Sequence, residues 1–589
     1  MTTTLLRSAA ALAMLCGASA HAQQATSPTL MPTPVSTPTP SPNAMVNLVR
    51  ALVAKGTLSP TEGQALLDQA NAEASHAAAP PGTVRVPYVP ESVRAQIRDE
   101  LKEDVLQTAK AEGWATPGTG RVQPWVSNVR IFGDFRYRAQ FNTFARGNAT
   151  NILDFGAINA PANGTEFNSA LPSGTGSTYT GLPRLNTSRD RNNLENLRLR
   201  VGLDARVNDW ADITFRLASG DTNSPVSTSQ ALGGGFVKKG IYIDQAYAVI
   251  RPIDDVALTG GRMPNPFYSY DVLWDPDLNF DGITLGAGHN FGDLRVSGVA
   301  GAFPYEYGSD NFPTVSDSGK TRTTNKWLYA AQIVGNWQAR HDIGVKVGGA
   351  YYHFTNVQGQ PSDPCDISQP GAQCSTDSLR PAFQQKGNTV FFLRNIVPPA
   401  NFPTDFPNRQ FVGLNFDYHI LDITGDVTVK LDDAKSVTVG GDYIKNLAFD
   451  RNAICRSFPS IAAGTTGAVV GPINNRTGTG CAAAGNDTTF SGGDTAWMAR
   501  VSVGYPSPKH WGEWNVFGAY KYIQTDAVLD GLVDNEFHLG GTNAQGYVIA
   551  GRAGLYDNVA ARVKYQSANQ ISGPPLGIDV LQLDLLVAF

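Results

Sequence analysis

The chain has 589 residues, of which 42% are hydrophobic and 60 are glycine, and its formal net charge is −5. This charge argues against a general nucleic-acid binder, and no run reaches the roughly 18 apolar residues of a membrane-spanning helix. Two classes stay open: a soluble protein of several domains, or a membrane β-barrel, whose strands never form a long apolar run.

Residues 1–22 have the features of a secretory signal peptide. Arg7 provides a positive start, an apolar core follows, and Ala20-His21-Ala22 is a small-residue cleavage site. The alternative is a short buried helix. Residues 23–43 are rich in Pro, Thr and Ser and predict a linker that does not pack.

Residues 44–78 predict a helical hairpin. Its second helix begins at Ser59-Pro60-Thr61-Glu62, which is a capping box with Pro at the first helical position. Residues 79–125 predict an extended segment and then a charged amphipathic helix, from 91 to about 112, with one narrow apolar stripe. That stripe needs a partner, and both a trimeric bundle beneath a membrane and a contact within the chain stay open.

From residue 126 to the end, apolar and polar residues alternate with period two. Val129, Ile131 and Phe135, for example, alternate with arginine and aspartate, which predicts strands with two different faces. Sixteen such segments can be counted: roughly 127–144, 193–208, 211–220, 240–251, 255–263, 282–291, 293–303, 325–338, 342–355, 410–431, 435–449, 493–505, 513–525, 545–556, 557–569 and 578–589. The tenth changes phase, and we expect a β-bulge near Leu421.

The connections between these segments alternate between long and short. Long ones cover 145–192, 221–239, 264–281, 304–324, 356–409, 450–492, 526–544 and 570–577. All turns of one kind then lie at one end, which is typical of an outer-membrane barrel with short periplasmic turns and long outer loops. The predicted fold is therefore all-β: a 16-stranded antiparallel transmembrane β-barrel over 126–589, preceded by a short periplasmic α-helical region.

The last strand, VLQLDLLVAF, ends on Phe589. Its Leu, Val and Phe parity is expected to face lipid. A terminal aromatic residue on an alternating strand resembles the signal that the outer-membrane barrel assembly machinery reads. The alternative is that Phe589 ends a soluble β-domain by chance.

Five cysteines are present, and Cys16 lies within the predicted signal peptide. The other four fall in two long loops of an exported protein, which predicts disulfides between Cys365 and Cys374 and between Cys455 and Cys481. A metal site is the alternative, but the spacings are irregular and no histidines cluster nearby.

Several stretches resemble the Gram-negative family of putative porins. They include GDFRYRAQF, LENLRLRVGLDARVNDWADITFRLASGD, YIDQAYAVI, GGRMPNPF and LWDPDLNFDGITLG, and the N-terminal KGTLSPTEGQALLDQA is similar to that family's first region. The resemblance covers most of the mature chain and is densest from 84 to 290. It implies a large outer-membrane barrel with a pore, but no particular solute.

Seven arginines share the polar parity of the first three strands: Arg130, Arg136, Arg138, Arg198, Arg200, Arg206 and Arg216. A sixteen-strand barrel is too wide to fill with its own side chains and holds water, so these arginines can line a wetted wall. They are expected to form a cationic ladder that sets an electric field. The alternative is that they pair with Asp134, Asp204 or loop acids for structure alone.

The third long loop carries the opposite charge, as Asp271, Asp275, Asp277 and Asp281. We expect it to fold inward and narrow the pore, with its acids facing the basic wall. A surface loop or a calcium site is the alternative, although the glutamate at the twelfth position of a calcium loop is missing.

Enzyme signatures such as G-x-S-x-G and H-E-x-x-H are missing, and no catalytic residue, cofactor or metal is expected. The expected function is passive diffusion of small hydrophilic solutes or ions across the outer membrane, by a barrel that is expected to be trimeric. The alternative is a structural or adhesive barrel whose loops bind partners and whose periplasmic segment tethers the cell wall, for instance by binding peptidoglycan.

Overall fold

The computed structural model describes residues 44–76, 128–162, 164–166, 181–221, 224–308, 324–368, 372–397, 408–460, 467–477, 481, 485 and 487–589. The predicted signal peptide, the linker and the predicted helix from 91 to 112 lie outside these residues. The chain divides into two units, 1–108 and 109–589, which are described separately.

The first unit contains two helices, α1 (Ala44–Ala54) and α2 (Pro60–His76). Ser59 begins α2 as the capping box predicts: its N–H donates to Glu62 Oε2 over 3.1 Å, and its Oγ accepts from the Glu62 N–H over 3.4 Å. Gly63 allows the helices to approach, because a Cβ at this position would overlap the Val53 side chain. No helix among the described residues is long and apolar enough to cross a membrane.

The second unit is a closed antiparallel barrel of sixteen strands, and the two-residue strand β5 (Gln230–Ala231) joins the same sheet. The sixteen are β1 (Val129–Phe144), β3 (Arg191–Asn208), β4 (Ala211–Ser219), β6 (Ile241–Ile253), β7 (Val256–Pro264), β8 (Asn279–Phe291), β9 (Leu294–Glu306), β10 (Lys326–Arg340), β11 (Ile343–Thr355), β17 (His419–Lys430), β18 (Ser436–Asn446), β21 (Thr495–Gly504), β22 (Trp514–Ile523), β23 (Ala544–Tyr556), β24 (Val559–Gln570) and β25 (Gly577–Ala588).

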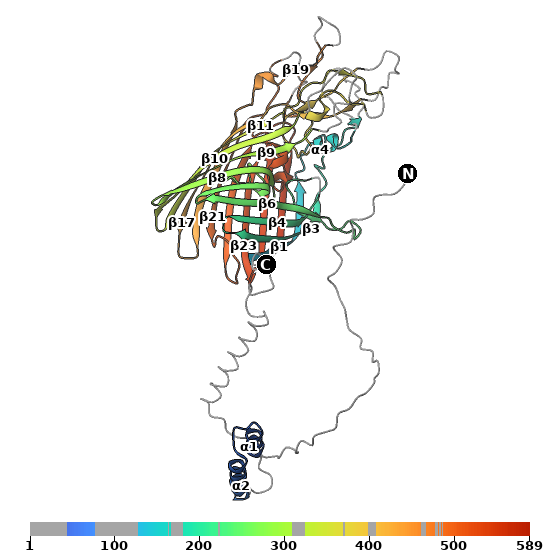
Figure 1. Cartoon of the computed structure of the whole chain (residues 1–589). Coiled ribbons are helices and arrows are strands. Elements are labelled where there is room, and N and C mark those ends of the chain that lie inside the picture. Colours follow the sequence, from blue (N-terminus) through green and yellow to red (C-terminus); the bar gives the residue numbers. More distant parts are fainter. Residues whose placement is uncertain are drawn as a thin grey trace, which may run out of the picture. The chain divides into compact units, whose positions relative to one another are not determined.

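Each of these strands pairs with the next one along the chain, and β1 closes the barrel against β25. The closing register runs from Asp134 opposite Ala588 to Phe144 opposite Ile578, and Phe589 exchanges backbone hydrogen bonds with Gly133. The strands lie side by side, with α4 and β19 among the loops at one end and the C-terminus at the other (Figure 1). The sixteen-strand barrel predicted from the alternation is confirmed.

Alternation also sorts the side chains between the two faces of the wall. In β25, Leu583 and Leu585 are exposed on the outside, whereas Gln582 and Asp584 are buried on the inside. A transmembrane barrel requires this arrangement, because its outer surface contacts lipid while its lumen is polar.

The tenth strand differs from its prediction. β17 begins at His419 and not near 410, and its register against β11 and β18 is continuous, so the bulge expected near Leu421 is absent. Residues 412–414 form a separate short strand, β16 (Val412–Leu414), which pairs with β13 (Val390–Phe392) inside the preceding loop. The phase change therefore marks the passage from loop to barrel wall, because Val412 and Leu414 pack in the loop core and face no lipid.

We number the long connections L1 (145–190), L2 (220–240), L3 (265–278), L4 (307–325), L5 (356–418), L6 (447–494), L7 (524–543) and L8 (571–576), and call their side of the barrel the loop end. The opposite side, with the short turns, is the turn end. L1 carries the short helix α4 (Phe155–Asn159), and L6 carries β19 (Arg456–Ser457).

A hydrophobic core lies between L3 and the inner wall. The Phe267 ring of L3 meets the Tyr352 ring of β11 edge-on at 5.1 Å, and the Trp274 ring meets the same Tyr352 at 5.2 Å. Phe280 and Phe303 complete this aromatic cluster from β8 and β9. Apolar packing thus holds L3 inside the barrel.

Candidate functional site: the lumen and its inward-folded loops

L3 runs through the lumen and bonds to successive strands of the wall. Its Tyr268 exchanges two hydrogen bonds of 2.7 Å with the Gln332 side chain of β10, and its hydroxyl donates to Asp426 of β17. The Tyr270 N–H then donates to Asp442 of β18 over 2.9 Å. L3 therefore crosses the lumen. It is the third long loop, the one that the sequence predicts to fold inward.

The acidic residues of L3 end at different parts of the wall. Asp271 forms an ion pair of 2.9 Å with Lys521 of β22. Asp277 lies 3.3 Å from both Arg198 and Arg200 of β3, and it also accepts a hydrogen bond of 2.8 Å from the Thr228 hydroxyl of L2. Among the expected L3 acids, Asp277 is thus the one that reaches the arginine-bearing wall.

Among the residues that the structure describes, no cation pairs with Asp275, which is held instead by backbone N–H groups. Its carboxylate accepts from Asp277 over 2.7 Å and from Asn535 over 3.0 Å. Burial, together with the nearby carboxylates of Asp534 and Asp277, raises the pKa of Asp275 well above its ordinary value. This residue joins L3 to L7 and does not face an open pore.

Asp281 was wrongly assigned to the loop. It lies in β8, opposite Arg262 of β7, with which it forms an ion pair of 3.0 Å. Asp281 shares its parity with Ile283 and Leu285, which are exposed on the outside of the barrel, although it also borders a cavity of about 1330 Å³. The strand begins earlier than predicted, because Asn279 and Phe280 already pair with β7.

The seven wall arginines fall into two groups. Arg136, Arg138, Arg198, Arg200 and Arg216 point into the lumen with side chains between 4% and 18% exposed. Arg130 and Arg206, at the turn end, are 75% and 68% exposed and face Asp204 and Asp212. The alternation therefore found the inward face, but only the first group lies beside the inward loops.

Each arginine of the inner group contacts an acid directly. Arg198 and Arg200 share Asp134 at 2.8 and 2.7 Å, and Arg216 bonds to Asp244 over 2.6 Å. Arg138 binds Asp584 of β25 over 2.7 Å, as well as Glu536. The sequence predicts an acidic loop facing a basic wall, and in the structure Asp277 of this loop contacts two of the wall arginines directly.

The contact with Arg198 and Arg200 determines the ionisation of Asp277. Burial alone would raise the pKa of its carboxyl, but Arg198 and Arg200 lower the pKa below its ordinary value. Asp277 is therefore ionised at neutral pH, and so it holds L3 to the β3 wall as a carboxylate.

L7 is a second inward loop that was not predicted from the sequence. Lys521 of β22, which is only 2% exposed, lies 2.7 Å from Asp534 of L7 as well as 2.9 Å from Asp271 of L3. The Leu532 carbonyl of L7 accepts from the Asp275 N–H over 2.9 Å. L3 and L7 are thus joined to each other beside the wall.

Glu536 attaches L7 to the wall on both sides of the seam between β1 and β25. Its carboxylate contacts Lys564 of β24 at 2.8 Å and Arg138 of β1. Although burial would raise its pKa, Lys564 and Arg138 hold the pKa of Glu536 well below its ordinary value. The acids at 526, 530, 534 and 536 were a signal that could have identified L7, since they match L3 in density.

Cavities lie on both sides of L3. The larger, of about 1330 Å³, opens toward the loop end and is lined by Trp274, Asp277 and Leu278 of L3 together with residues of L1, L2, L5 and L7. A second cavity, of about 750 Å³, lies toward the turn end, where Tyr268 of L3 and Lys346 of β11 line it. We call them the outer and inner vestibules.

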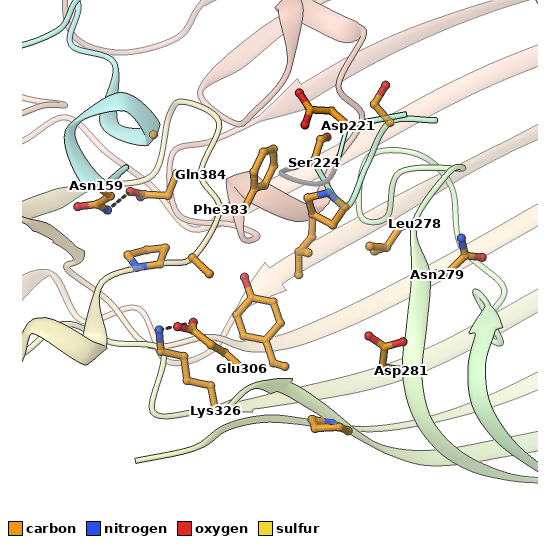
Figure 2. Close-up of a pocket in the computed structure, with 18 of the residues that line it drawn as sticks. Asn159, Asp221, Ser224, Leu278, Asn279, Asp281, Glu306, Lys326, Phe383 and Gln384 are labelled. Atoms are coloured by element: carbon orange, nitrogen blue, oxygen red, sulfur yellow. Dashed lines mark hydrogen bonds and ion pairs between the residues drawn. The ribbon is translucent and has the colours of Figure 1, made fainter. Parts of the chain in front are cut away.

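Figure 2 shows the polar groups of the outer vestibule. Lys326 of β10 and Glu306 of β9 point toward each other and form an ion pair of 2.7 Å. The Asn159 amide of α4 donates to Gln384 of L5 over 2.9 Å. Phe383 lies between Gln384 and Leu278 in this view, so both apolar and polar side chains line the cavity.

The loops above the vestibule have a rigid frame of their own. The structure pairs Cys365 with Cys374 in L5 and Cys455 with Cys481 in L6. Arg394 of L5 is buried and bonds to Asp377 over 2.6 Å. Within the described residues, no group of three or more His, Cys, Asp and Glu side chains could hold a metal ion.

A closed sixteen-strand barrel with lipid-facing apolar residues, a charged lumen and inward-folded loops defines the class of outer-membrane channels. A family model described as "Putative porin" matches residues 42–589. The chain therefore belongs to this porin family and is an outer-membrane protein. A search of curated proteins found no match.

Solved structures similar to this chain are outer-membrane barrels, at low identity. OprB of Pseudomonas putida shares 9% identity over 78% of this chain and 94% of its own, with a TM-score of 0.38. The outer membrane channel DcaP of Acinetobacter baumannii shares 11% identity, with coverage of 78% and 97% and a TM-score of 0.33. Salmonella typhi OmpF, in complex with daunomycin, shares 9% over 78% and 97%, with a TM-score of 0.35.

Proposed function

We propose that this porin lets small hydrophilic solutes or ions diffuse passively across the outer membrane. The observation that carries the proposal is the pair of cavities, the outer and inner vestibules, that lie on either side of L3. A barrel of this strand number holds water in its interior, so the vestibules supply most of an aqueous path. No chemical reaction is part of this function.

The narrowest part of the path is formed by L3 and L7 together. Asp277 lines the floor of the outer vestibule and contacts Arg198 and Arg200. A solute that leaves this vestibule along β3 and β4 meets these charges and the Arg216–Asp244 pair. Asp244 of that pair also lines the outer vestibule. Charged groups at such a constriction select solutes by size and charge.

The direction of the barrel and its partners belong to the same proposal. The short turns and the N-terminal helices face the periplasm, the long loops face outward, and Phe589 is read by the assembly machinery. Three copies assemble in the membrane, and the helical segment contacts peptidoglycan. The even number of strands supports one part of this proposal. With sixteen strands, β1 begins and β25 ends on the same side of the membrane, at the turn end.

One observation favours a second function, that of a structural or adhesive barrel. L3 and L7 are bonded to β1, β3, β10, β17, β18, β22 and β24, which is the arrangement of a plug as well as of a constriction. In that case the disulfide-containing loops L5 and L6 would bind a partner and the lumen would pass nothing.

Swelling of liposomes that contain the purified protein separates these functions. Uptake of neutral sugars that falls with increasing sugar size is the result expected of a diffusion channel. Liposomes that swell no faster than protein-free ones, with heat-modifiable, folded barrel present in their membrane, would overturn the channel and favour the adhesive alternative.

A further inference from the structure

One arginine of the inner wall, Arg552 of β23, lies outside the ion pairs described above. It shares its parity with Val548 and Ala550, which are buried on the inside, whereas Ile549 is exposed on the outside of the barrel. In the register between β23 and β24, the residue opposite Arg552 is Arg562. Two arginine side chains therefore extend into the lumen from neighbouring positions, and directly opposed like charges weaken a pair of strands.

Arg562 has an acid partner that Arg552 does not share. Asp584 of β25 accepts from Arg562 Nε over 2.7 Å, and it also accepts from Arg138 Nε over 2.7 Å. One carboxylate thus serves two guanidinium groups. In the described part of the chain no carboxylate pairs with Arg552, and Arg562 is the charged group that acts on it. The positive charge of Arg552 is therefore not cancelled by an ion pair.

The guanidinium of Arg552 is unbonded and can be reached from the lumen. Its Nε is covered by protein and has no hydrogen-bond partner. The side chain as a whole is only partly buried, and its two Nη groups, which make no hydrogen bond to any described residue, keep some exposed surface. Guanidinium N–H groups donate strong, charge-assisted hydrogen bonds to anions such as carboxylates and phosphates.

The acid on the neighbouring strand side does not neutralise this charge. Asn515 of β22 is opposite Arg552 in the register, and Glu513 lies two residues before it. The Glu513 carboxylate is engaged in its own turn, where it accepts from the N–H groups of Lys509 over 2.6 Å and His510 over 3.0 Å. Arg552 therefore stays an isolated cation from this side as well.

Arg552 lies on the turn-end side of the inward loop L7. On β24, Lys564 forms an ion pair of 2.8 Å with Glu536 of L7, and Arg562 lies two residues nearer the turn end, opposite Arg552. The inward arginines of β3 and β4 differ, because each contacts a carboxylate and much of its charge is offset there. A solute that has passed L7 along the β23 and β24 wall thus meets an uncompensated positive charge.

We propose that Arg552 gives the pore a preference for small anions over cations. The inference rests on the proposed diffusion function and names the charge of the solutes that the function favours. An unpaired cation on a confined wall raises the local concentration of anions, and its Nη groups donate to each anion as it passes. Paired arginines elsewhere in the lumen fix the inward loops, whereas Arg552 sets the sign of the selectivity.

Reversal potential under a KCl gradient, measured on the purified full-length protein in a planar bilayer, tests the proposal. We expect the unaltered protein to prefer chloride. Arg552→Gln should lower the chloride-to-potassium permeability ratio about twofold or more, because the uncompensated charge is lost. Arg552→Lys should keep most of the preference, because it restores a positive charge at the same place on the wall.

The matched control is Arg340→Gln, which removes an exposed arginine at the turn-end limit of β10. The same charge is lost there in open solvent, where salt screens it, so the ratio should change little. Heat-modifiability on gels shows whether each variant is folded. A cation preference in the unaltered protein, or an unchanged ratio in Arg552→Gln, would overturn the role of Arg552 and leave the diffusion function standing. A folded protein without conductance would overturn the diffusion function, and this inference with it.

Discussion

The carboxylate of Asp277 on L3 lies 3.3 Å from the guanidinium of Arg198 on β3. Asp277 belongs to the loop between β7 and β8, whereas Arg198 lies on β3, and both side chains are largely shielded from solvent. Their contact holds L3 across the lumen at the floor of the outer vestibule. On the proposed diffusion path, a solute that moves toward the inner vestibule encounters these paired charges. Arg198 and Arg200 also share Asp134.

Neutralising this arginine pair should change ion selectivity. With Arg198→Gln and Arg200→Gln, the carboxylates of Asp134 and Asp277 lose their partners, so the local potential becomes more negative and cations are favoured. We expect the cation-to-anion permeability ratio to rise roughly two- to fivefold. Reversal potential under a salt gradient measures this ratio.

Arg206→Gln is the matched control for that experiment. Its side chain is well exposed at the turn end and lies 3.9 Å from its acid, so we expect little change in reversal potential. An unaltered reversal potential in the Arg198 and Arg200 variant would remove these residues from the selectivity of the pore.

Replacing Lys521 should loosen both inward loops. Lys521→Met leaves the buried carboxylate of Asp534 and the partly exposed carboxylate of Asp271 without this cation. Removing one partner of a buried pair, such as Lys521 with Asp534, costs about 3–5 kcal/mol. Denaturant unfolding and the open-channel noise of single channels should both report this change.

Lys445→Met provides the comparison, because Lys445 pairs with Asp494 at a similar 2.8 Å but is 41% exposed. A surface pair of this kind contributes about 0–1 kcal/mol. If the Lys521 variant unfolds at the same denaturant concentration as the Lys445 variant, the lysine does not hold the loops.

Removing the L6 disulfide should affect the loop and not the barrel. Cys455 and Cys481 are 26 positions apart in the sequence, and closing a loop of this length stabilises the fold by about 3 kcal/mol in the chain-entropy account. Cys455→Ser with Cys481→Ser should make L6 sensitive to protease, while the heat-modifiability of the barrel stays unchanged. Loss of the folded band would show that L6 is needed for barrel assembly.

The packing of L5 against L7 should weaken as pH rises toward neutrality. Burial raises the pKa of Asp526 to about 6 and that of Asp530 to about 7, so both carboxyls hold protons in the folded loop that they release when it opens. The stabilisation from these two carboxyls is complete below their ordinary pKa and is lost as the pH rises to about 7. The loss amounts to a few kcal/mol, because each unit by which a pKa is raised corresponds to about 1.4 kcal/mol.

Hydrogen exchange of L7 amides, corrected for intrinsic rates, tests this at about pH 5 and about pH 7, where we expect slower opening at the lower pH. Lys386 acts in the other direction, because burial lowers its pKa to about 7. Its buried charge destabilises the folded loop below that pH, and this destabilisation is relieved as the pH rises above 7. Asp530→Asn should flatten the dependence, and an equally steep dependence in that variant would contradict the assignment.

Local sequence patterns predicted the wall well, because side-chain parity is a property of each strand alone. The alternation around Arg136 and Arg138 identified inward positions that the structure shows to be buried. The same reasoning failed at Val412 and Leu414, whose apolar parity comes from packing against L5 itself. Period two cannot tell a short loop strand from a barrel strand.

The partners of the charges could not be predicted, because they depend on contacts far apart in the chain. The sequence predicts that Asp271 and Asp277 both face the arginine wall from the loop, yet Asp271 meets Lys521 of β22 and only Asp277 meets Arg198. Glu536 meets Arg138 across 398 residues of sequence, and no local feature of L7 indicates this pairing. Acid density alone gave the inward loop but not the course it takes.

Single-channel recording in a planar bilayer tests the central claim most directly. If the vestibules connect past L3 and L7, the purified protein will give discrete, reproducible conductance steps, with a reversal potential that shifts when Arg198 and Arg200 are neutralised. A folded, inserted barrel that gives no steps would contradict the account, because L3 and L7 would then form a plug.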